Sequence, residues 1–265
     1  MDEETVELYN GKVVLNYSDS GHVYTLDGKV VYGVTSIVKV IDKPALVGWG
    51  VKETINHYKR RIEPGKEYSE VDLDIIHDEA KSARFASARK SASIGSITHN
   101  WIEAYVEAGL AGEELPERPV DKSVNKALDA FFEWTKEHDI KFKYSERKVY
   151  SMEYDYAGTL DGEAEVDGNL DLIDYKTSTG IYPEYWLQIA AYMQAREEEE
   201  GHKYDGAWIV RIDKRSGKFE TERKSREEIM EVYLPAFLSA LGIYNWQMAL
   251  RDKLFNKEQD GYKKN

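Results

Sequence analysis

The chain has no cysteine among its 265 residues, and this absence excludes several kinds of site. Disulfide bonds, thiolate zinc sites, iron–sulfur clusters held by this chain and cysteine nucleophiles all require that residue. Long apolar runs are missing too, since no stretch approaches the ~18 consecutive apolar residues of a membrane helix. The acidic start, MDEETVELYN, lacks the basic and apolar regions of a secretory signal. We therefore expect a cytoplasmic protein.

Positive charge is in deficit. Lysine and arginine total 36 residues against 49 aspartates and glutamates, so the formal net charge is −13. This balance argues against a surface that binds polyanions all over, because phosphate binding depends on basic side chains. The segment KSARFASARK at 81–90 is a local exception, with four basic side chains, no acidic one and Phe85. Contact with phosphates and a solvated helix face that balances nearby acids both fit this segment.

The first half of the chain predicts a β element followed by helices. Residues 12–33 are β-prone, and Asp27-Gly28 lies between two β-forming runs, which is typical of a tight hairpin turn. Residues 34–61 are expected to be helical, with a proline in a first turn. Residues 69–108 are also expected to be mostly helical, with Gly95 as a possible break.

The second half predicts a mixed α/β core. After a helix from Lys126, the pattern indicates three short strands, a helix, two strands and a long terminal helix. The middle strands are expected in KYSERKVYS, YAGTLDGEAEV and NLDLIDYK, and the later pair in GAWIVRI and GKFETERK. This order predicts a central mixed sheet flanked by helices.

One predicted hairpin, GTLDGEAEVDGNLDLIDYK at 158–176, carries acids where a buried strand should be apolar. Asp167-Gly168 indicates a two-residue turn, which pairs Val166 with Asn169. Continued outward, this register places Asp161 opposite Asp174, with Cβ atoms about 4.5 to 5.5 Å apart. Lys176 projects on the same face as Asp174, because side chains alternate along a strand.

Two opposed carboxylates repel each other unless a cation lies between them. Mg²⁺ prefers carboxylate oxygens and often bridges protein acids to substrate phosphates. An adjacent lysine suits the stabilisation of a charged transition state or the orientation of a metal-bound water. The cluster therefore predicts phosphodiester hydrolysis. Two alternatives are an ordinary ion-pair network and a calcium loop over 163–174, although such a loop normally lies between helices rather than strands.

These residues resemble the motifs of the PD-(D/E)XK nucleases, specifically the RecB-like exonuclease branch and its phage-type members. The resemblance is carried by GTLD at 158–161, DYK at 174–176 and QIAAY at 188–192, in that order. It implies a restriction-endonuclease-like core in which Asp161 and Asp174 bind metal and Lys176 assists hydrolysis. Leu160 replaces the proline of the superfamily's name, which is common in this branch.

The same resemblance implies further site residues. Gln188 and Tyr192, at i and i+4 on one helical face, match the branch's Q-x-x-x-Y motif. Gly95 and His99 in GSITHNWIEAY match a G-x-x-x-H helix, so His99 is implied as a metal ligand, beside the backbone carbonyl of Tyr175. Glu146 matches an acid near the metal, and a surface ion pair with Arg147 or Lys148 is its alternative.

The implied function is a metal-dependent DNA nuclease, an exonuclease that uses Mg²⁺ or Mn²⁺. Residues 93–265 would form the nuclease core, and residues 1–92 a β-hairpin and helical region that shapes the DNA path. Candidate DNA contacts are Lys81, Arg84, Arg89, Lys90, Thr177 and Ser178, the last two with turn capping as an alternative. A noncatalytic nucleic-acid-binding or assembly protein with the same fold is the alternative function. The absence of a G-x-x-x-x-G-K-[ST] motif means that any ATP-driven motor is a separate chain. A recombination, repair or replication protein is the expected partner, in the host cytoplasm if the chain is phage-encoded.

Overall fold

The computed structural model of the protein describes residues 3–262, and side chains up to residue 253. The chain divides into two compact units, Met1–Ile41 with Trp101–Asn265, and Asp42–Asn100. The domain boundary expected near residue 92 lies within a helix of the second unit, whereas the compact units change over at residues 41 and 100. Each unit is described below by itself.

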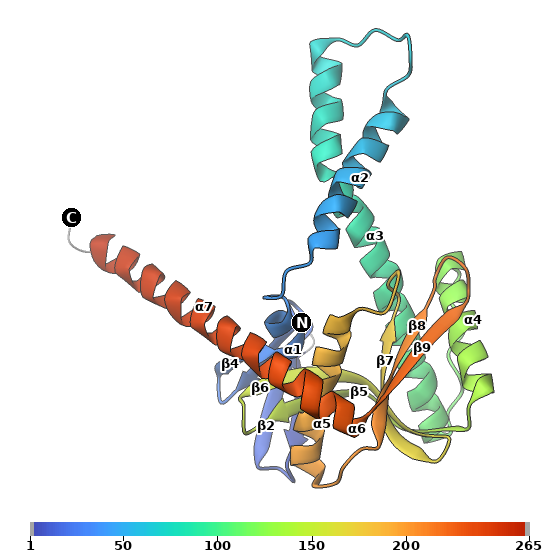
Figure 1. Ribbon diagram of the computed structural model, residues 1–265, viewed down its shortest axis with the longest axis vertical. Coiled ribbons are helices and arrows are strands. Elements are labelled where there is room, and N and C mark those ends of the chain that lie inside the picture. Colours follow the sequence, from blue (N-terminus) through green and yellow to red (C-terminus); the bar gives the residue numbers. More distant parts are fainter. Residues whose placement is uncertain (1–2, 263–265) are drawn as a thin grey trace. The chain divides into compact units, whose positions relative to one another are not determined.

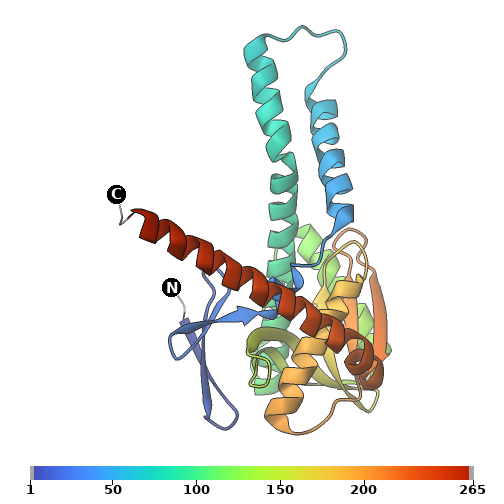
Figure 2. The same cartoon turned by 60° about the vertical axis from the view of Figure 1, so that its left-hand side comes forward.

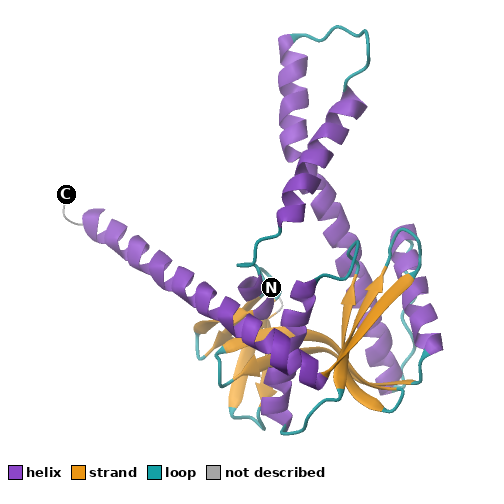
Figure 3. Ribbon diagram, viewed as in Figure 1, coloured by secondary structure: helices purple, strands orange, loops and turns teal. Residues whose placement is uncertain are grey.

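Nine strands form a mixed sheet in the described part of the first unit (Figures 1 and 3). Its order is β1-β2-β3-β4-β6-β7-β8-β9, and β5 pairs with β6. The pairs β4–β6 and β7–β8 are parallel and the others antiparallel. The strands are β1 (Glu3–Leu8), β2 (Val13–Ser18), β3 (Val23–Leu26), β4 (Lys29–Gly33), β5 (Ile140–Ser151), β6 (Tyr156–Val166), β7 (Asn169–Lys176), β8 (Gly206–Ile212) and β9 (Phe219–Ser225).

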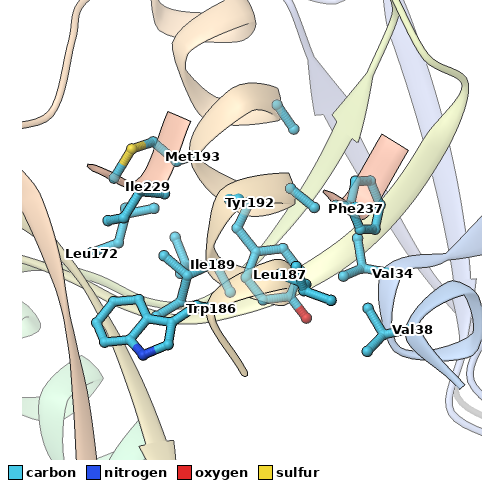
Figure 4. Close-up of a cluster of buried hydrophobic side chains, with 14 of the residues drawn as sticks. Val34, Val38, Leu172, Trp186, Leu187, Ile189, Tyr192, Met193, Ile229 and Phe237 are labelled. Carbon is cyan, nitrogen blue, oxygen red and sulfur yellow. The ribbon is translucent and has the colours of Figure 1, made fainter. Parts of the chain in front are cut away.

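Helices cover both faces of this sheet, which confirms the predicted fold class. On one face, α1 (Val34–Val38), α5 (Pro183–Glu200) and α7 (Leu234–Tyr262) share an apolar cluster with strand residues such as Leu172 (Figure 4). A short helix α6 (Arg226–Glu228) and a π-helical turn η1 (Ile229–Tyr233) precede α7. On the other face, α4 (Lys122–Glu137) places the ring of Phe131 5.6 Å from that of Tyr175.

The N-terminal region is a four-stranded antiparallel arrangement rather than a single hairpin. The predicted turn between β3 and β4 is confirmed, since Asp27 and Gly28 have φ of 50° and 74°. Two consecutive positive φ values define a type I′ turn, whose twist matches that of the strands. Strand β1 was not expected because its sequence, EETVEL, is rich in acids, which are usual on an edge strand.

The second unit consists of α2 (Pro44–Arg61) and most of α3 (Glu70–Ala111), which run antiparallel side by side (Figure 2). The hydroxyl of Thr54 donates to the carbonyl of Ala80, and the rings of Tyr58 and His77 are 5.9 Å apart. The expected break at Gly95 is wrong, because α3 continues through it. A single glycine costs a helix only about 1 kcal/mol, which the surrounding turns offset.

Across both units, no helix of the described chain is long and apolar enough to span a membrane.

Candidate active site

The turn between β6 and β7 has the predicted two-residue geometry. Asp167 and Gly168 have φ of 50° and 84°, so they form a type I′ turn. Val166 pairs with Asn169, and the ladder continues in the expected register. Asp167 also holds the preceding helix end in place, because its carboxylate accepts from the backbone N–H of Asp139 at 2.9 Å. Local turn chemistry therefore sets the register of the acidic hairpin.

The ladder between β6 and β7 ends one pair before the two aspartates. Gly162 with Ile173 is its final pair, and Asp161 and Asp174 follow at the point where the strands separate. The backbone N–H of Tyr175, two residues beyond the last ladder pair, donates to Oδ2 of Asp161 at 2.8 Å. Backbone donors in a protein interior require an acceptor. Asp161 thus replaces a carbonyl of the ladder and places a negative charge between the separating strands.

Asp174 and Lys176 form a close ion pair on the face of β7 that α5 covers. The Nζ of Lys176 donates to Oδ1 of Asp174 at 2.8 Å and lies 2.6 Å from Oδ2. The Asp174 side chain is 2% exposed and that of Lys176 is 19% exposed. Contacts to ionised partners of this length are about twice as strong as neutral hydrogen bonds. The ion pair therefore holds the ammonium group of Lys176 in one position, where its side chain is still partly exposed.

The charge state of Lys176 follows from two opposed effects. Burial alone lowers the pKa of Lys176, since it disfavours the charged form. The negative charges of Asp174 and Asp161 and the hydrogen bond to Asp174 outweigh burial, so the pKa is raised above its ordinary value. Lys176 is consequently an ammonium ion at neutral pH. It can donate hydrogen bonds and offset negative charge.

Helix α5 orients this ammonium group. The Nζ of Lys176 donates to Oε1 of Gln188 at 3.3 Å, and it lies 5.0 Å from the centroid of the Tyr185 ring. A cation over an aromatic face is attracted to the ring electrons. The structure therefore brings Gln188 of the Q-x-x-x-Y motif into contact with Lys176 of the D-x-K motif.

Tyr192, the other residue of that motif, packs beneath the carboxylates. Its side chain belongs to the apolar cluster that includes Val34 (Figure 4). Burial raises the pKa of the Tyr192 phenol well above its ordinary value, and the charges of Asp174 and Asp161 add to the shift. A Cβ at Gly158 would lie 2.6 Å from Cε1 of Tyr192, closer than side chains tolerate. The glycine of GTLD is thus required by the tyrosine of QIAAY.

Glu146 lies in a strained position of β5. The regular pairs on either side of it place it opposite Asp161. Its φ is 49°, a conformation that residues other than glycine rarely adopt. Such strain costs about 1–3 kcal/mol and persists only where neighbouring contacts demand it. Glu146, Asp161 and Asp174 therefore occupy the same level on three neighbouring strands.

The ion-pair alternative for Glu146 is partly confirmed. Glu146 lies 3.6 Å from the Nζ of Lys148, and that lysine is 5% exposed. The pairing with Arg147 is wrong, because Arg147 contacts Glu199 and Glu200 on α5 instead. The metal-proximal role of Glu146 stays a prediction.

Glu103, on the last turns of α3, was missed in the sequence. Burial first, and then the charges of Glu146 and Glu107, raise the pKa of its carboxyl group to about 7, although Lys148 acts in the opposite direction. A glutamate with this pKa exchanges a proton near neutral pH. The available signal was its position four residues after His99, which places both on one helical face.

The calcium-loop alternative is wrong. Residues 163–174 form strand, turn and strand, and their acids are engaged elsewhere. The carboxylate of Glu163 accepts from Arg196 and from the hydroxyl of Tyr204, at 3.2 and 2.7 Å. Glu165 accepts from Lys141 on the neighbouring strand at 2.8 Å. These contacts tie the hairpin to α5 and to β5, and they engage Glu163 and Glu165 with different partners.

Several predicted residues belong to a different compact unit from the two aspartates. His99, Lys81, Arg84, Arg89 and Lys90 belong to the second unit, so their predicted roles stay predictions. Thr177 and Ser178 follow β7 directly in the first unit. The Ser178 hydroxyl donates to the carbonyl of Gly180 at 2.8 Å, as the turn-capping alternative requires.

The donors just past the end of the β6–β7 ladder suit a hard divalent cation. Asp161 and Asp174 supply carboxylate oxygens, and Tyr175, whose backbone carbonyl is a further oxygen donor, directly follows Asp174 in sequence. Within the described residues, no three His, Cys, Asp or Glu side chains are grouped closely enough to hold an ion by themselves. Mg²⁺ does not require such a cage, since it is usually held by one or two carboxylates and keeps several waters. The residues present therefore fit Mg²⁺ better than calcium or zinc.

Comparison with known proteins gives a limited result. No family model matches the chain, and no curated protein matches it significantly. The solved structures similar to part of it include LHK-Exo in complex with dAMP, and an alkaline exonuclease (LHK-Exo) from Laribacter hongkongensis. Each shares 17% sequence identity, covers 58% of this chain and 85% of the other, and has a TM-score of 0.31. Values this low leave the assignment of the site to its own residues.

Proposed function

We propose that the protein is a divalent-metal-dependent deoxyribonuclease of the PD-(D/E)XK type, acting as an exonuclease. The observation that carries the proposal is the arrangement at the end of β7. There, the buried carboxylate of Asp174 holds the protonated amine of Lys176, and Asp161 lies at the same level on the neighbouring strand β6. An acid pair with a fixed ammonium ion suits a reaction at a phosphate group, where negative charge develops.

Asp161, Asp174 and the carbonyl of Tyr175 would hold one or two Mg²⁺ or Mn²⁺ ions, and the ligand role of His99 stays a prediction. When bound, such an ion polarises a phosphoryl oxygen and lowers the pKa of a bound water. The residues of the chain supply the rest. Lys176 donates to the attacking water or to the developing oxyanion, because its raised pKa keeps it charged.

Gln188 and Tyr192 act by positioning. Gln188 accepts from the ammonium group and restricts its direction. Tyr192 fills the space below Gly158 and keeps water away from the carboxylates. Glu146, at the level of Asp161, is proposed to contact the water shell of the ion rather than the ion itself. The predicted DNA contacts at Thr177 and Ser178 lie just beyond Lys176 in sequence, where a phosphate would pass.

The test is degradation of an end-labelled linear DNA in Mg²⁺ or Mn²⁺. The wild type should release nucleotides from the ends and leave a covalently closed circle intact. Lys176→Ala should lose at least about 100-fold in rate. Lys176→Arg keeps the charge and serves as a second variant if Lys176→Ala unfolds. Lys141→Ala is the matched control, because Lys141 is an exposed lysine of the same sheet that pairs with Glu165.

Undiminished degradation by a folded Lys176→Ala protein would refute the catalytic role of Lys176. Digestion of circles would exclude an exonuclease. DNA binding without cleavage in any divalent ion would favour a noncatalytic binding or assembly protein.

A further inference from the structure

Charge is segregated along the α2–α3 hairpin of the second unit. The contact between Thr54 and Ala80 divides the hairpin into two halves. The half made of residues 42–54 and 80–100, here called the basic half, has six lysines and arginines and two acids. The half made of residues 55–79, the acidic half, has four basic and seven acidic residues. The whole chain carries a net charge of −13, so the basic half is a local exception to its charge.

Three cations of the basic half, Lys81, Arg89 and Lys90, are weakly neutralised. Within the described chain, Arg89 and Lys90 are exposed and take part in no ion pair. Lys81 pairs with Asp78 at 3.0 Å, but both side chains are more than three-quarters exposed. An exposed pair of this kind contributes little stability and is screened by salt. These cations therefore remain available to an anionic partner.

Phe85 adds an aromatic surface among these cations. Its side chain is 53% exposed, and the Arg84 guanidinium lies 4.5 Å from the ring centroid. Residues 88–93 of the same helix are exposed on every side, and most of them are alanine and serine. A helix segment that is basic, exposed all round and carries an aromatic ring requires a partner that offers both negative charge and a flat apolar face.

Single-stranded DNA offers both. Its phosphates pair with lysine and arginine, and its unpaired bases stack on aromatic rings. A duplex offers the phosphates but keeps the faces of its bases stacked on one another. An acidic peptide would satisfy the cations and leave Phe85 exposed. The combination favours a single strand over the other two partners.

We propose that the basic half binds single-stranded DNA, with Arg89 and Lys90 contacting phosphates and Phe85 stacking on a base. The inference deepens the proposed function, on which it rests for the identity of the nucleic acid, by naming the form of DNA that the protein holds. Arg84 supports the ring from its other side and adds positive charge.

The test is fluorescence anisotropy with the full-length protein and a labelled oligo-thymidine, compared with a blunt duplex of the same length. Chelator is present throughout, so cleavage does not interfere. Wild type should bind the single strand at least about tenfold more tightly than the duplex, because stacking adds to phosphate contacts. Arg89→Gln with Lys90→Gln should flatten the plot of log affinity against log salt by about 1.4 units, which corresponds to two lost phosphate contacts.

Phe85→Ala should weaken single-strand binding about tenfold without changing the salt slope. Phe85→Leu should weaken it nearly as much, since leucine is apolar but has no aromatic face. The matched control is Lys59→Gln with Arg60→Gln, which removes the same charge from the acidic half and should change affinity less than twofold. Circular dichroism would check that each variant stays helical.

Equal losses in the two double variants would overturn the proposal, because net charge alone would explain them. Equal affinity for duplex and single strand, with no effect of Phe85→Ala, would overturn it as well. The nuclease proposal would be refuted by a different result. A protein that binds the single strand in chelator but never cleaves in Mg²⁺ would refute the nuclease and support this inference. A protein that cleaves in Mg²⁺, but whose affinity for the single strand is unchanged by the Arg89 and Lys90 substitutions, would support the nuclease and refute this inference.

Discussion

Two buried lysines in the first unit are surrounded by acids and an aromatic ring, yet their surroundings differ in one respect. Lys176 on β7 makes two short contacts to a single carboxylate that is itself 2% exposed. Lys148 on β5 is shared between Glu4 at 3.2 Å and Glu146 at 3.6 Å, whose side chains are 52% and 32% exposed. The rings are equivalent, Tyr185 at 5.0 Å and Tyr17 at 4.8 Å.

The difference shows how geometry separates a reactive group from a structural one. The Asp174–Lys176 pair holds its ammonium in one place beside Asp161, and Lys176 keeps a raised pKa. Around Lys148 the acids exceed the cations, and the surplus charge is reduced by the raised pKa of Glu103. Short and directed contacts suit catalysis, whereas the looser cluster relieves repulsion through a proton.

Asp161 offers the largest expected effect, because its charge and its hydrogen bond can be removed separately. Asp161→Asn keeps an oxygen for the N–H of Tyr175 but loses the charge, and should reduce DNA hydrolysis by about 10³-fold with little change in stability. Asp161→Ala also removes the oxygen that accepts from this N–H. Its free energy of unfolding should be lower than that of Asp161→Asn by about 1–3 kcal/mol. Hydrolysis rates and urea unfolding of both variants check this, and equal stability of the two would contradict the capping role.

The two lysines should differ in stability when their charge is removed. Lys176→Met removes the ammonium group from the buried carboxylate of Asp174, and should lower the free energy of unfolding by about 3–5 kcal/mol. Lys148→Met leaves acids that reach solvent, so about 1–2 kcal/mol is expected. Mg²⁺ should restore part of the loss in Lys176→Met alone. Thermal unfolding with and without Mg²⁺ measures both, and similar losses would remove the distinction between the clusters.

The close packing of the Tyr192 ring against Gly158 can be tested by replacing the glycine. Gly158→Ala forces a Cβ against the ring of Tyr192, and should destabilise the protein by about 1–3 kcal/mol through overpacking. Gly180→Ala is the matched control, because its nearest atoms lie 3.9 Å from the added Cβ. Urea unfolding compares the two, and a neutral Gly158→Ala would show that the ring moves freely.

The cluster of Lys148 with Glu4, Glu103 and Glu146 should give the smallest effect, which is a dependence of stability on pH. The pKa of Glu103 rises from 4.5 to about 7 in the folded protein. Between those values the folded state binds more protons than the unfolded chain, so the contribution of Glu103 to stability falls as pH rises from 4.5 to about 7. Because Glu103 is partly exposed, the loss should be only about 1 kcal/mol.

Glu103→Gln should abolish that dependence and make the protein more stable than wild type at pH values above the pKa of Glu103. Urea unfolding on both sides of that pKa measures the change. Glu113→Gln, at an exposed glutamate just after α3, is the control. If the two variants have the same pH dependence, the raised pKa does not belong to Glu103.

Local sequence signals predicted much of the first unit. The two Asp-Gly turns, at 27–28 and 167–168, are confirmed because type I′ geometry demands residues that tolerate positive φ. The order of elements after Lys126 is confirmed because the apolar period changes clearly between helix and strand. Signals failed where the local composition is unfavourable for the element that forms. The acidic strand β1 and the uninterrupted α3 depend on neighbours that local propensity does not describe.

The sequence by itself determined the register that places Asp161 beside Asp174, and the spacing that places Lys176 on the same face. Both follow from a two-residue turn and the alternation of side chains along a strand. Only the tertiary structure decided that the ladder ends after Gly162 and Ile173, so that Asp161 accepts the N–H of Tyr175. It also decided that Glu4, Glu103 and Glu146 surround Lys148. The contacts of Glu4 and Glu103 in this cluster join residues more than forty positions apart, and they form only when separate elements pack together.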